Sequence, residues 1–435
     1  MKRIATHTLG CKLNFAETSD LTRRFAAAGW TPVDFDSTAD LYVINTCTVT
    51  AVAEKKCRNA IRQATARNRD AVVAVIGCFA QNAATEIAAI DGVDIILGNG
   101  QKHNLLQHVE RFMARHRDGA TEEPPTTATE QPEGFHLAYS HADRTRTFFK
   151  VQDGCDYFCT YCAIPFARGR SRSATIAETV AMANEIAASG AKEVVLTGVN
   201  TGTFGQAHGE TFLDLIKALD GIEGIERYRI SSIEPNLLTD DIVAFVAQSR
   251  AFLPHFHIPL QAGSDKVLKM MHRRYDTRFY SALLQKIKRA MPDACIAADI
   301  MAGFNGEDDE EFENVKRFVD SLPISYLHVF TFSERPGTAA LKMESRIDIH
   351  RRREHSRQLH ELSEQKKKAF YHQQTGQTRP VLWESDVKDG MMYGFTDNYI
   401  RVRRRHDAAL VNTVTDFRLE RMIEEEEVFE GTDEA

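Results

Sequence analysis

The 435-residue sequence contains no apolar run long enough to cross a bilayer, so we expect no membrane-spanning helix. It also shows no charged-then-apolar leader, so we expect a cytoplasmic protein whose thiols stay reduced. The formal net charge of -7 gives no basic excess and therefore does not indicate a nucleic-acid binder. Basic runs do occur at 350–353 and 401–405, and local charge governs such contacts more than the average does.

In a reducing compartment the eight cysteines indicate metal binding or catalysis more than disulfides. Cys155, Cys159 and Cys162 stand at CxxxCxxC spacing. Three thiolates at this spacing can bind one iron-sulfur cube and leave its fourth iron without a protein ligand. A substrate or cosubstrate can coordinate to an open iron, so the spacing indicates chemistry as well as folding.

The N-terminal part alternates apolar and amphipathic stretches, which predicts a small parallel α/β domain. The expected strands are 3–9, 41–45 and 71–76, with helices at 14–28 and 50–66. A cysteine follows each strand, and the three are Cys11, Cys47 and Cys78. Because parallel strands end at one edge of a sheet, these thiols could form a second metal-binding triad. Three incidental buried thiols explain the same spacing, so the sequence leaves both interpretations open.

Two further cysteines, Cys57 and Cys295, have no cysteine at ligand spacing, and we expect them to be core or surface thiols. The stretch 117–134 is rich in Pro, Thr, Glu and Gly, which is typical of a linker or a long surface loop. The sequence predicts three domains, at 1–116, 142–372 and 373–435, with a linker at 117–141 between the first and the second.

A second α/β series follows, and its six strand candidates predict a full or partial (β/α) barrel. They are 147–152, 193–197, 227–233, 255–260, 294–301 and 326–332. Cys155, Cys159 and Cys162 follow the first strand, at the end where barrel active sites lie. A basic helix over 347–372 then leads to short strand candidates that predict a small all-β barrel. These are 380–384, 391–395, 398–403, 409–414 and 427–429.

The CxxxCxxC motif resembles the signature of the radical S-adenosylmethionine superfamily, which places an aromatic residue, here Tyr161, before the last cysteine. The resemblance implies a 4Fe-4S cluster that binds S-adenosylmethionine. One electron from the reduced cluster then cleaves the sulfonium and releases a 5'-deoxyadenosyl radical.

The whole chain resembles the methylthiotransferases, which combine an N-terminal cluster domain, a radical domain and a C-terminal TRAM domain. The matching motifs are Gly10–Asn14, Asn45–Cys47, Gly77–Cys78, Ile164–Pro165, Arg168–Arg170, Leu196–Asn200, Ser231–Pro235, Pro259–Ser264 and Asp299–Phe304. The resemblance implies that Cys11, Cys47 and Cys78 bind a second 4Fe-4S cluster on the sulfur side of the reaction. It also implies an electron donor such as flavodoxin or ferredoxin, and a sulfur source.

Gly-Cys-Lys-Leu-Asn at 10–14, with Glu17 nearby, resembles the MtaB type within this family. That type implies tRNA as partner and methylthiolation of carbon 2 of threonylcarbamoyladenosine at position 37. Relatives that act on isopentenyladenosine or on a ribosomal protein are the alternatives. A non-enzymatic two-cluster electron carrier is an alternative of another class, but it leaves Tyr161 and the barrel motifs unexplained.

Further contacts follow from these resemblances and from strand-end positions. For S-adenosylmethionine we expect Tyr161, Gly198 and Asn200, with Glu234 near the ribose, although a buried salt bridge is the alternative for Glu234. For RNA we expect four residues of the C-terminal module: Tyr399, Arg401, Arg403 and Arg405. Phe395 is expected to pack inside that barrel. His255 and His257 share a strand face as a metal pair would, but a barrel-interior role is favoured.

Overall fold

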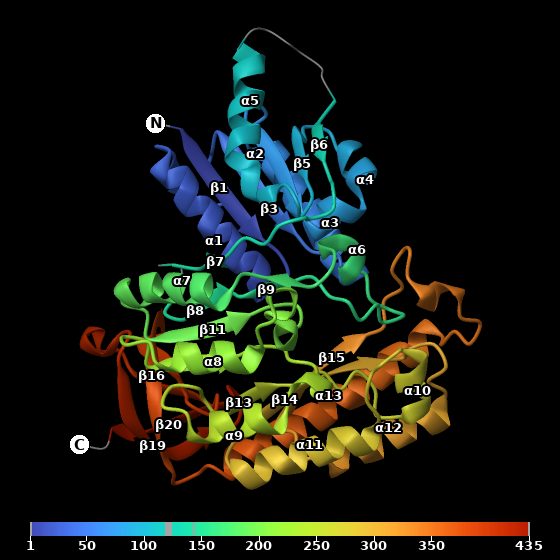
Figure 1. Ribbon diagram of the computed structural model, residues 1–435, viewed down its shortest axis with the longest axis vertical. Helices are drawn as coiled ribbons and strands as arrows, with labels where there is room; N and C mark the ends of the chain where they lie inside the picture. The colour runs from blue at the N-terminus through green and yellow to red at the C-terminus, as the bar shows by residue number, and fades with distance from the viewer. Residues whose placement is uncertain (1, 118–123, 142–143, 434–435) are drawn as a thin grey trace. The chain divides into compact units, whose positions relative to one another are not determined.

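The computed structural model describes residues 2–117, 124–141 and 144–433 (Figure 1). The chain forms two compact units, and each is made of segments that are distant in sequence. The first comprises 1–143, 148–174 and 333–341, and the second comprises 144–147, 175–332 and 342–435. All six cysteines of the two triads therefore belong to the first unit.

The first unit is built on a six-stranded parallel sheet with the order β2-β1-β3-β4-β5-β6 (Figure 1). Its strands are β1 (Arg3–Thr8), β2 (Thr31–Val33), β3 (Leu41–Thr46), β4 (Val72–Gly77), β5 (Ile95–Leu97) and β6 (Thr126–Ala128). The central strands β3 and β4 are buried along their whole length, as parallel strands covered on both faces must be. The predicted parallel α/β architecture is confirmed.

Helices cover both faces of this sheet. Helices α1 (Lys12–Ala27) and α5 (Leu105–Arg117) place Phe25 and Leu105 in the apolar core of one face. Helix α2 (Ala51–Arg67) covers the other face with the short helices α3 (Cys78–Asn82) and α4 (Ala84–Ala88). A 3-10 turn, η1 (Lys102–Asn104), leads into α5.

The range predicted as a linker contributes strands to this unit. Strand β6 extends the parallel sheet, and β7 (Ala138–Tyr139) pairs antiparallel with β8 (Thr147–Lys150). Residues 118–123 of that range lie outside the described residues. Strands β9 (Gln152–Asp153) and β10 (Arg172–Ser173) form a short antiparallel pair, and helix α6 (Ile164–Arg168) lies between them in sequence.

The second unit contains five parallel strands of the predicted barrel series. They are β11 (Glu193–Thr197), β12 (Arg227–Ile230), β13 (His255–His257), β14 (Cys295–Ala302) and β15 (Tyr326–Thr331). Strand ladders and single bridges join them in that order. Within the described part of this unit, no pairing returns from β15 to β11, which agrees with the partial form of the barrel.

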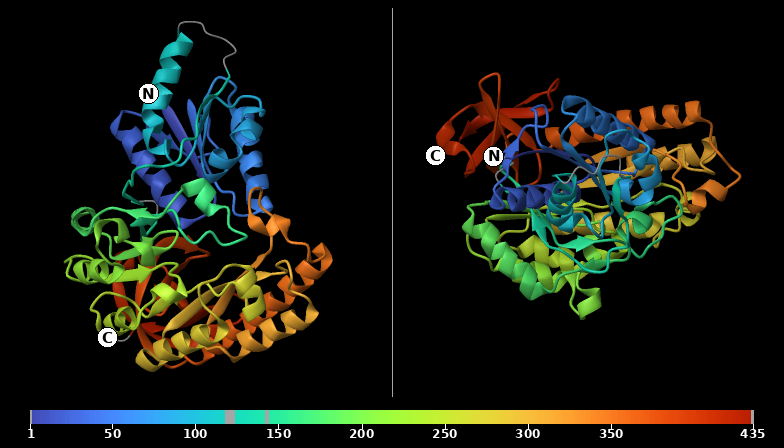
Figure 2. Two further views of the ribbon diagram at one scale, coloured as in Figure 1. Left: turned by 45° about the vertical axis from the view of Figure 1, so that its right-hand side comes forward. Right: turned by 90° about the horizontal axis from the view of Figure 1, so that it is seen from above.

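Helices follow most of these strands. They are α7 (Ile176–Ala188), α8 (Phe212–Asp220), α9 (Asp240–Gln248), α10 (Asp265–Met270), α11 (Thr277–Ala290), α12 (Asp309–Ser321) and α13 (Ile349–His372). Helix α13 packs along β14 and β15, and Figure 2 shows α11, α12 and α13 on the same side of these strands.

The C-terminal strands of the second unit close into the predicted small barrel, in the order β16-β17-β18-β20-β19. They are β16 (Thr378–Lys388), β17 (Met391–Thr396), β18 (Arg401–Arg405), β19 (Val414–Ile423) and β20 (Val428–Asp433). The predicted strand at 409–414 is wrong. Asp407 accepts a hydrogen bond from the Ala409 amide at 2.9 Å and Asn412 has a φ of 59°, so this segment turns and the strand begins at Val414.

Candidate functional site

The first cysteine triad lies at the carboxyl edge of the sheet in the first unit. Cys11 follows β1 and precedes α1, Cys47 follows β3, and Cys78 follows β4 as the first residue of α3. Strands β1, β3 and β4 are neighbours, so the predicted convergence of these strand ends is confirmed. Cys11 is exposed, whereas Cys47 and Cys78 are buried.

The backbone at Gly10 approaches Cys47 closely. Gly10 has a φ of 104°, and a Cβ atom at this position would lie 3.0 Å from Cys47 Sγ and 2.8 Å from its Cβ. Only glycine provides both this conformation and this space. The sequence Gly-Cys at 10–11 thus brings the backbone next to Cys11 against the thiol of Cys47.

The buried thiols interact electrostatically. The pKa of Cys47 is raised to about 12, chiefly by burial and to a smaller extent by the neighbouring thiols of Cys78 and Cys11, against a backbone hydrogen bond from Val49 that lowers it. Three neighbouring thiolates repel one another, and this repulsion costs free energy unless a cation binds to them. Bound iron removes that cost, because metal ligands bind deprotonated and sulfur ligands suit iron-sulfur clusters. The donor set therefore fits an iron-sulfur cluster.

Three asparagines support this edge. Asn14 donates to the carbonyl oxygens of Leu9, at 2.8 Å, and Thr46, at 3.0 Å, which are the residues just before Gly10 and Cys47. Asn45 donates to the Asn14 carbonyl at 3.1 Å. Asn99 donates to Cys78 Sγ at 3.5 Å. Such outer contacts fix the orientation of metal-binding side chains.

The remaining two cysteines are core residues, as predicted. Cys57 is fully buried in α2, where its thiol donates to the Cys47 carbonyl at 3.5 Å and accepts from the Cys47 amide at 3.4 Å. Cys295 is buried at the start of β14, in the second unit. Burial raises the pKa of Cys57 to about 11 and that of Cys295 to about 12, so both stay as thiols.

The second triad occupies the loop between β9 and α6. The loop folds tightly, since the Cys155 amide donates to the Gly169 carbonyl at 3.1 Å and the Cys162 amide to the Cys159 carbonyl at 3.0 Å. Cys155 and Cys162 are half-buried and Cys159 is buried. Tyr161 lies between them in sequence and is half-buried. The loop thus presents three thiols within eight residues, and three thiolates can bind one cube and leave its fourth iron open.

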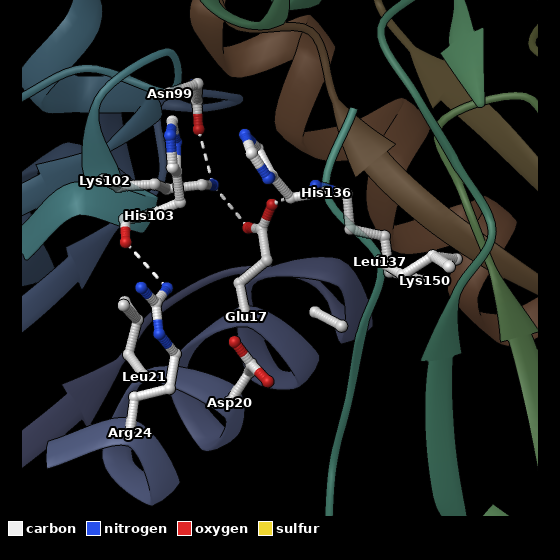
Figure 3. A pocket seen from close by; sticks show the side chains of 11 residues that line it. Glu17, Asp20, Leu21, Arg24, Asn99, Lys102, His103, His136, Leu137 and Lys150 are labelled. Atoms are coloured by element: carbon white, nitrogen blue, oxygen red, sulfur yellow. Dashed lines mark hydrogen bonds and ion pairs between the residues drawn. The ribbon is translucent and has the colours of Figure 1, made fainter. Parts of the chain in front are cut away.

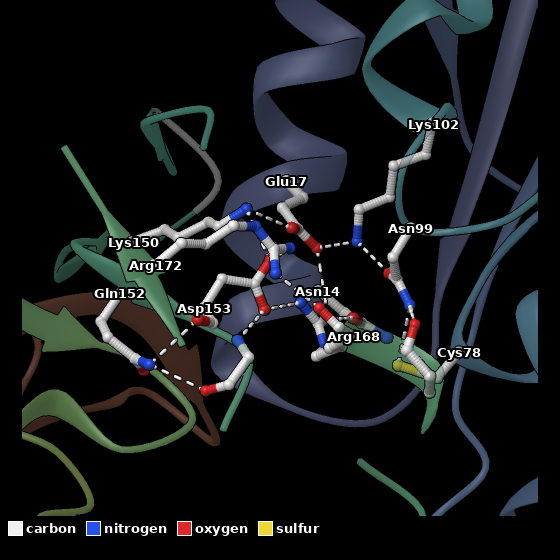
Figure 4. A network of polar contacts seen from close by, with 12 residues as sticks. Asn14, Glu17, Cys78, Asn99, Lys102, Lys150, Gln152, Asp153, Arg168 and Arg172 are labelled. Atoms are coloured by element: carbon white, nitrogen blue, oxygen red, sulfur yellow. Dashed lines mark hydrogen bonds and ion pairs between the residues drawn. The ribbon is translucent and has the colours of Figure 1, made fainter. Parts of the chain in front are cut away.

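Helix α6 connects the two triads within the first unit. The Ala167 carbonyl accepts a hydrogen bond at 2.8 Å from Asn99, the same amide that contacts Cys78. The next residue, Arg168, donates to the Asn14 side chain and pairs with Asp153 at 2.8 Å (Figure 4). Asp153 in turn accepts from the Gly154 amide, which directly precedes Cys155.

Arg168 belongs to a buried group of ionised side chains that we call the charge cluster (Figure 4). Its members are Glu17, Lys102, Lys150, Asp153, Arg168 and Arg172. The first five side chains are 1% to 6% exposed. Despite burial, the neighbouring cations hold the pKa of Glu17 and of Asp153 well below the usual range, so both carboxylates are ionised.

A cavity of about 350 Å³ opens beside the charge cluster (Figure 3). Glu17, Lys102 and Lys150 form part of its wall. His103 and His136 stack across it with ring centroids 3.7 Å apart. Burial lowers the pKa of His103 to about 4 and also lowers that of His136, so both rings are neutral at physiological pH.

The residues expected to bind S-adenosylmethionine lie at strand ends of the second unit. Gly198 and Asn200 follow β11, and Glu234 follows β12. The two loops meet where Thr201 Oγ1 donates to the Ser232 carbonyl at 3.0 Å. Glu234 forms an ion pair with Arg273, as its alternative interpretation stated. Cosubstrate contact by these residues stays a prediction.

The expected RNA-binding residues differ in their surroundings. Arg401 and Arg405 are exposed on β18. Arg403, on the same strand, pairs with Glu430 at 2.8 Å and with Glu426. The Tyr399 ring stacks between Phe395, at 4.8 Å, and His255, at 4.4 Å. Phe395 is half-buried in this stack.

His255 and His257 do not form a metal pair, because only His257 belongs to the polar group found here. His257 Nε2 lies 2.7 Å from Asp299 Oδ1, and His328 lies beside them, so that ligand atoms of the three residues are within 4.8 Å of one another. His255 instead stacks on Tyr399. The barrel-interior interpretation holds for His255, and His257 is oriented by a carboxylate.

Sequence reasoning did not identify the charge cluster. Arg168 and Glu17 stood out only as parts of family motifs, and Lys102, Lys150 and Asp153 gave no signal. Charged residues are almost never fully buried unless paired, so a sequence pattern places them on the surface by default. Apart from Lys150 and Asp153, the partners here are between 15 and 151 residues apart, which no local pattern detects.

Among the helices of the described residues, none has the length and apolar character needed to cross a membrane.

Comparisons with known proteins agree with these features. Residues 3–98 match the family described as "Uncharacterized protein family UPF0004", and residues 149–319 match the radical SAM superfamily. A solved radical S-adenosylmethionine methyltransferase, TsrM from Kitasatospora setae, has a similar fold, with a TM-score of 0.56 and 14% identity. The alignment covers 78% of this chain and 77% of TsrM.

Relatives with close sequences extend over nearly the whole chain. The threonylcarbamoyladenosine tRNA methylthiotransferase MtaB of Bacillus subtilis is 38% identical over 92% of this chain and 90% of its own length. The protein of the same name from Aquifex aeolicus is 35% identical, over 92% of this chain and 96% of its own length. A tRNA-2-methylthio-N(6)-dimethylallyladenosine synthase from Endomicrobium trichonymphae is 31% identical over 90% of both chains. The chain belongs to the MtaB-type family of radical SAM methylthiotransferases.

Proposed function

We propose that this enzyme methylthiolates carbon 2 of threonylcarbamoyladenosine at position 37 of tRNA, beside the anticodon. Two relatives named as threonylcarbamoyladenosine tRNA methylthiotransferases are 38% and 35% identical to this chain. A relative named for dimethylallyladenosine is 31% identical. The observation that carries the proposal is the presence of both cysteine triads in one compact unit, joined through helix α6. An enzyme that transfers sulfur to a carbon radical needs the two sites to act together.

Each triad has a separate role in this proposal. Cys155, Cys159 and Cys162 hold the 4Fe-4S cluster that binds S-adenosylmethionine, and Cys11, Cys47 and Cys78 hold the 4Fe-4S cluster on the sulfur side. When bound, the clusters and S-adenosylmethionine supply a carbon-centred radical and a methylated sulfur for the transfer.

The side chains of the first unit keep these ligands in place. Asn99 orients Cys78 through its amide, and Asn14 fixes the backbone before Cys11 and Cys47. The tight hydrogen bond from Cys155 to Gly169 holds the second triad against α6. Gly198, Asn200 and Glu234 at strand ends, and Tyr161 in the loop of the second triad, are proposed to contact S-adenosylmethionine.

The C-terminal barrel is proposed to be a TRAM module that binds the tRNA. Arg401 and Arg405 are exposed, and phosphate contacts need accessible cations. Tyr399 and Arg403 are the further candidates, although both already have partners within the second unit. We propose that the enzyme works in the cytoplasm with an electron donor such as flavodoxin or ferredoxin and with a separate sulfur source.

Mass spectrometry of tRNA nucleosides tests the substrate. A strain that lacks this protein is expected to lose 2-methylthio-threonylcarbamoyladenosine and to accumulate the unmethylthiolated nucleoside. A plasmid copy of the wild-type gene should restore the product, and a copy with Cys159→Ala should not. Unchanged product in the deletion strain rules out the assignment, and loss of the isopentenyl derivative instead points to the alternative substrate.

A further inference from the structure

The charge cluster carries more positive than negative charge. Four cations, Lys102, Lys150, Arg168 and Arg172, face two carboxylates, Glu17 and Asp153, which leaves an excess of two positive charges. A buried excess of charge is expensive unless a counter-charge lies close by. The cluster therefore needs an anionic neighbour within the first unit.

The cations of this cluster approach the first cysteine triad. Arg168 donates to Asn14, which holds the backbone before Cys11 and Cys47. Lys102 Nζ lies 2.7 Å from Asn99 Oδ1, and the amide of the same Asn99 donates to Cys78 Sγ. Burial lowers the pKa of the Arg168 guanidinium, but Asp153 raises it, and the thiols of Cys78 and Cys11 raise it by smaller amounts.

The member of the charge cluster that lies nearest in sequence to the second triad is, in contrast, a carboxylate. Asp153 precedes Cys155 by two residues and accepts a hydrogen bond from the intervening Gly154 amide at 2.8 Å. A Cβ atom at Gly154 would lie 2.0 Å from the Arg170 carbonyl oxygen, so this tight turn beside Asp153 has room only for glycine. The hydrogen bonds thus link cations of the cluster to Asn14 and Asn99 beside the first triad, and a carboxylate to the Gly154 amide beside the second.

We propose that the charge cluster is a redox-tuning device that stabilises the reduced state of the cluster on Cys11, Cys47 and Cys78 more than that of the cluster on Cys155, Cys159 and Cys162. A 4Fe-4S cluster with thiolate ligands gains one electron and one unit of negative charge on reduction, with no proton required. Nearby cations favour that more negative state and raise the reduction potential, since the net charge around a cluster helps set it. Arg168 and Lys102 act in this scheme through their charge and do not ligate iron, and their hydrogen bonds to Asn14 and Asn99 hold that charge beside the first triad.

An anaerobic redox titration of the loaded full-length protein, followed by electron paramagnetic resonance, tests this proposal. Arg168→Gln keeps a hydrogen-bonding side chain but removes the charge, and the three remaining cations still outnumber the two carboxylates by one. We expect its sulfur-side cluster to be about tenfold harder to reduce, a shift of about 59 mV for one electron. The other cluster should shift by less. Arg168→Lys keeps the charge and should restore most of the potential.

Arg172→Gln is the matched control. Arg172 pairs with Asp153 at 2.9 Å but is the most exposed member and contacts neither Asn14 nor Asn99 in the described contacts. It should move the sulfur-side potential less than Arg168→Gln does. If Arg168→Gln fails to retain that cluster, Lys102→Gln decides the question by the same shift.

The proposal is overturned if Arg168→Gln, or Lys102→Gln in its place, leaves both potentials unchanged while the iron content stays at about eight per chain, as two 4Fe-4S clusters require. The inference rests on the two-cluster part of the proposed function and on no property of the tRNA. Its failure is therefore distinct from failure of that function, which about four irons in the wild-type protein would indicate.

Discussion

Arg229 of β12 forms a buried ion pair with Glu193 of β11, with Nε 2.7 Å from Oε1, and both side chains are at most 1% exposed. The same guanidinium donates to the carbonyl oxygens of Thr396, at 2.7 Å, and Asp397, at 2.8 Å, in the turn after β17. The pair therefore ties the parallel strands to the C-terminal barrel within the second unit.

Glu193→Gln is expected to lower the free energy of unfolding of the second unit by about 3–5 kcal/mol, the usual cost of breaking a buried pair from one side. The cations of Arg227 and Arg229 lose their carboxylate, although burial already lowers the pKa of Arg227 to about 10. Denaturant unfolding measures the change. Glu226→Gln is the control, since its pair with Lys192 is exposed and should contribute about 1 kcal/mol or less.

Arg401→Gln is expected to weaken tRNA binding and to reduce the slope of log K against log salt by about 0.7 to 0.9, the value of one phosphate contact. The side chain is exposed and lies over the Tyr393 ring at 4.3 Å, which orients it without a carboxylate partner in the described contacts. Binding assays with unmodified tRNA at several salt concentrations measure both effects.

Arg403→Gln provides the comparison on the same strand. Its guanidinium already pairs with Glu430 and Glu426, so its loss should change the salt slope less than the loss of Arg401 does. Equal slopes for wild type and Arg401→Gln would mean that this face of the barrel does not contact phosphate.

Cys57→Ala is expected to retain the full iron content, whereas Cys47→Ala should lose about half of it, because one of two 4Fe-4S clusters loses a ligand. The Cys57 thiol forms hydrogen bonds of 3.4 and 3.5 Å with the backbone of Cys47, and the side chain is fully buried in the apolar core. Iron and sulfide assays on anaerobically reconstituted protein measure the difference. A comparable loss from both variants shows that Cys57 is a ligand or that its packing holds the site.

The sequence predicted the strand ends that bring Cys11, Cys47 and Cys78 together, because parallel strands with buried apolar runs fix that edge. It also predicted the parallel strands of the second unit and, apart from the strand at 409–414, the C-terminal barrel. It could not predict that segment 148–174 packs with the first unit, since this depends on pairs such as Lys150 with Glu17 over 133 residues. Asn99 was missed for the same reason, since its partners Cys78 and Ala167 lie 21 and 68 residues away.

The stacked histidines of the cavity predict a loss of stability in mild acid. The folded pKa of His103 is about 4, below the value near 6.5 of an unfolded chain, because burial and then His136 disfavour its charged form. The unfolded chain thus binds more protons between these values, so this contribution is complete above about pH 6.5 and is lost as the pH falls toward 4. The ion pairs of Glu17 and Asp153 lose their contributions only at lower pH, because their pKa values are depressed below the ordinary carboxyl range.

The midpoint temperature of unfolding, measured anaerobically at pH 7.5 and 5.5, tests this prediction. The wild-type protein should lose more stability between these values than His103→Gln, whose neutral side chain takes up no proton. His350→Gln, at an exposed position on α13 in the second unit, should behave like the wild type. If His103→Gln and the wild type lose the same stability, the His103 ring is not held neutral by its stack with His136.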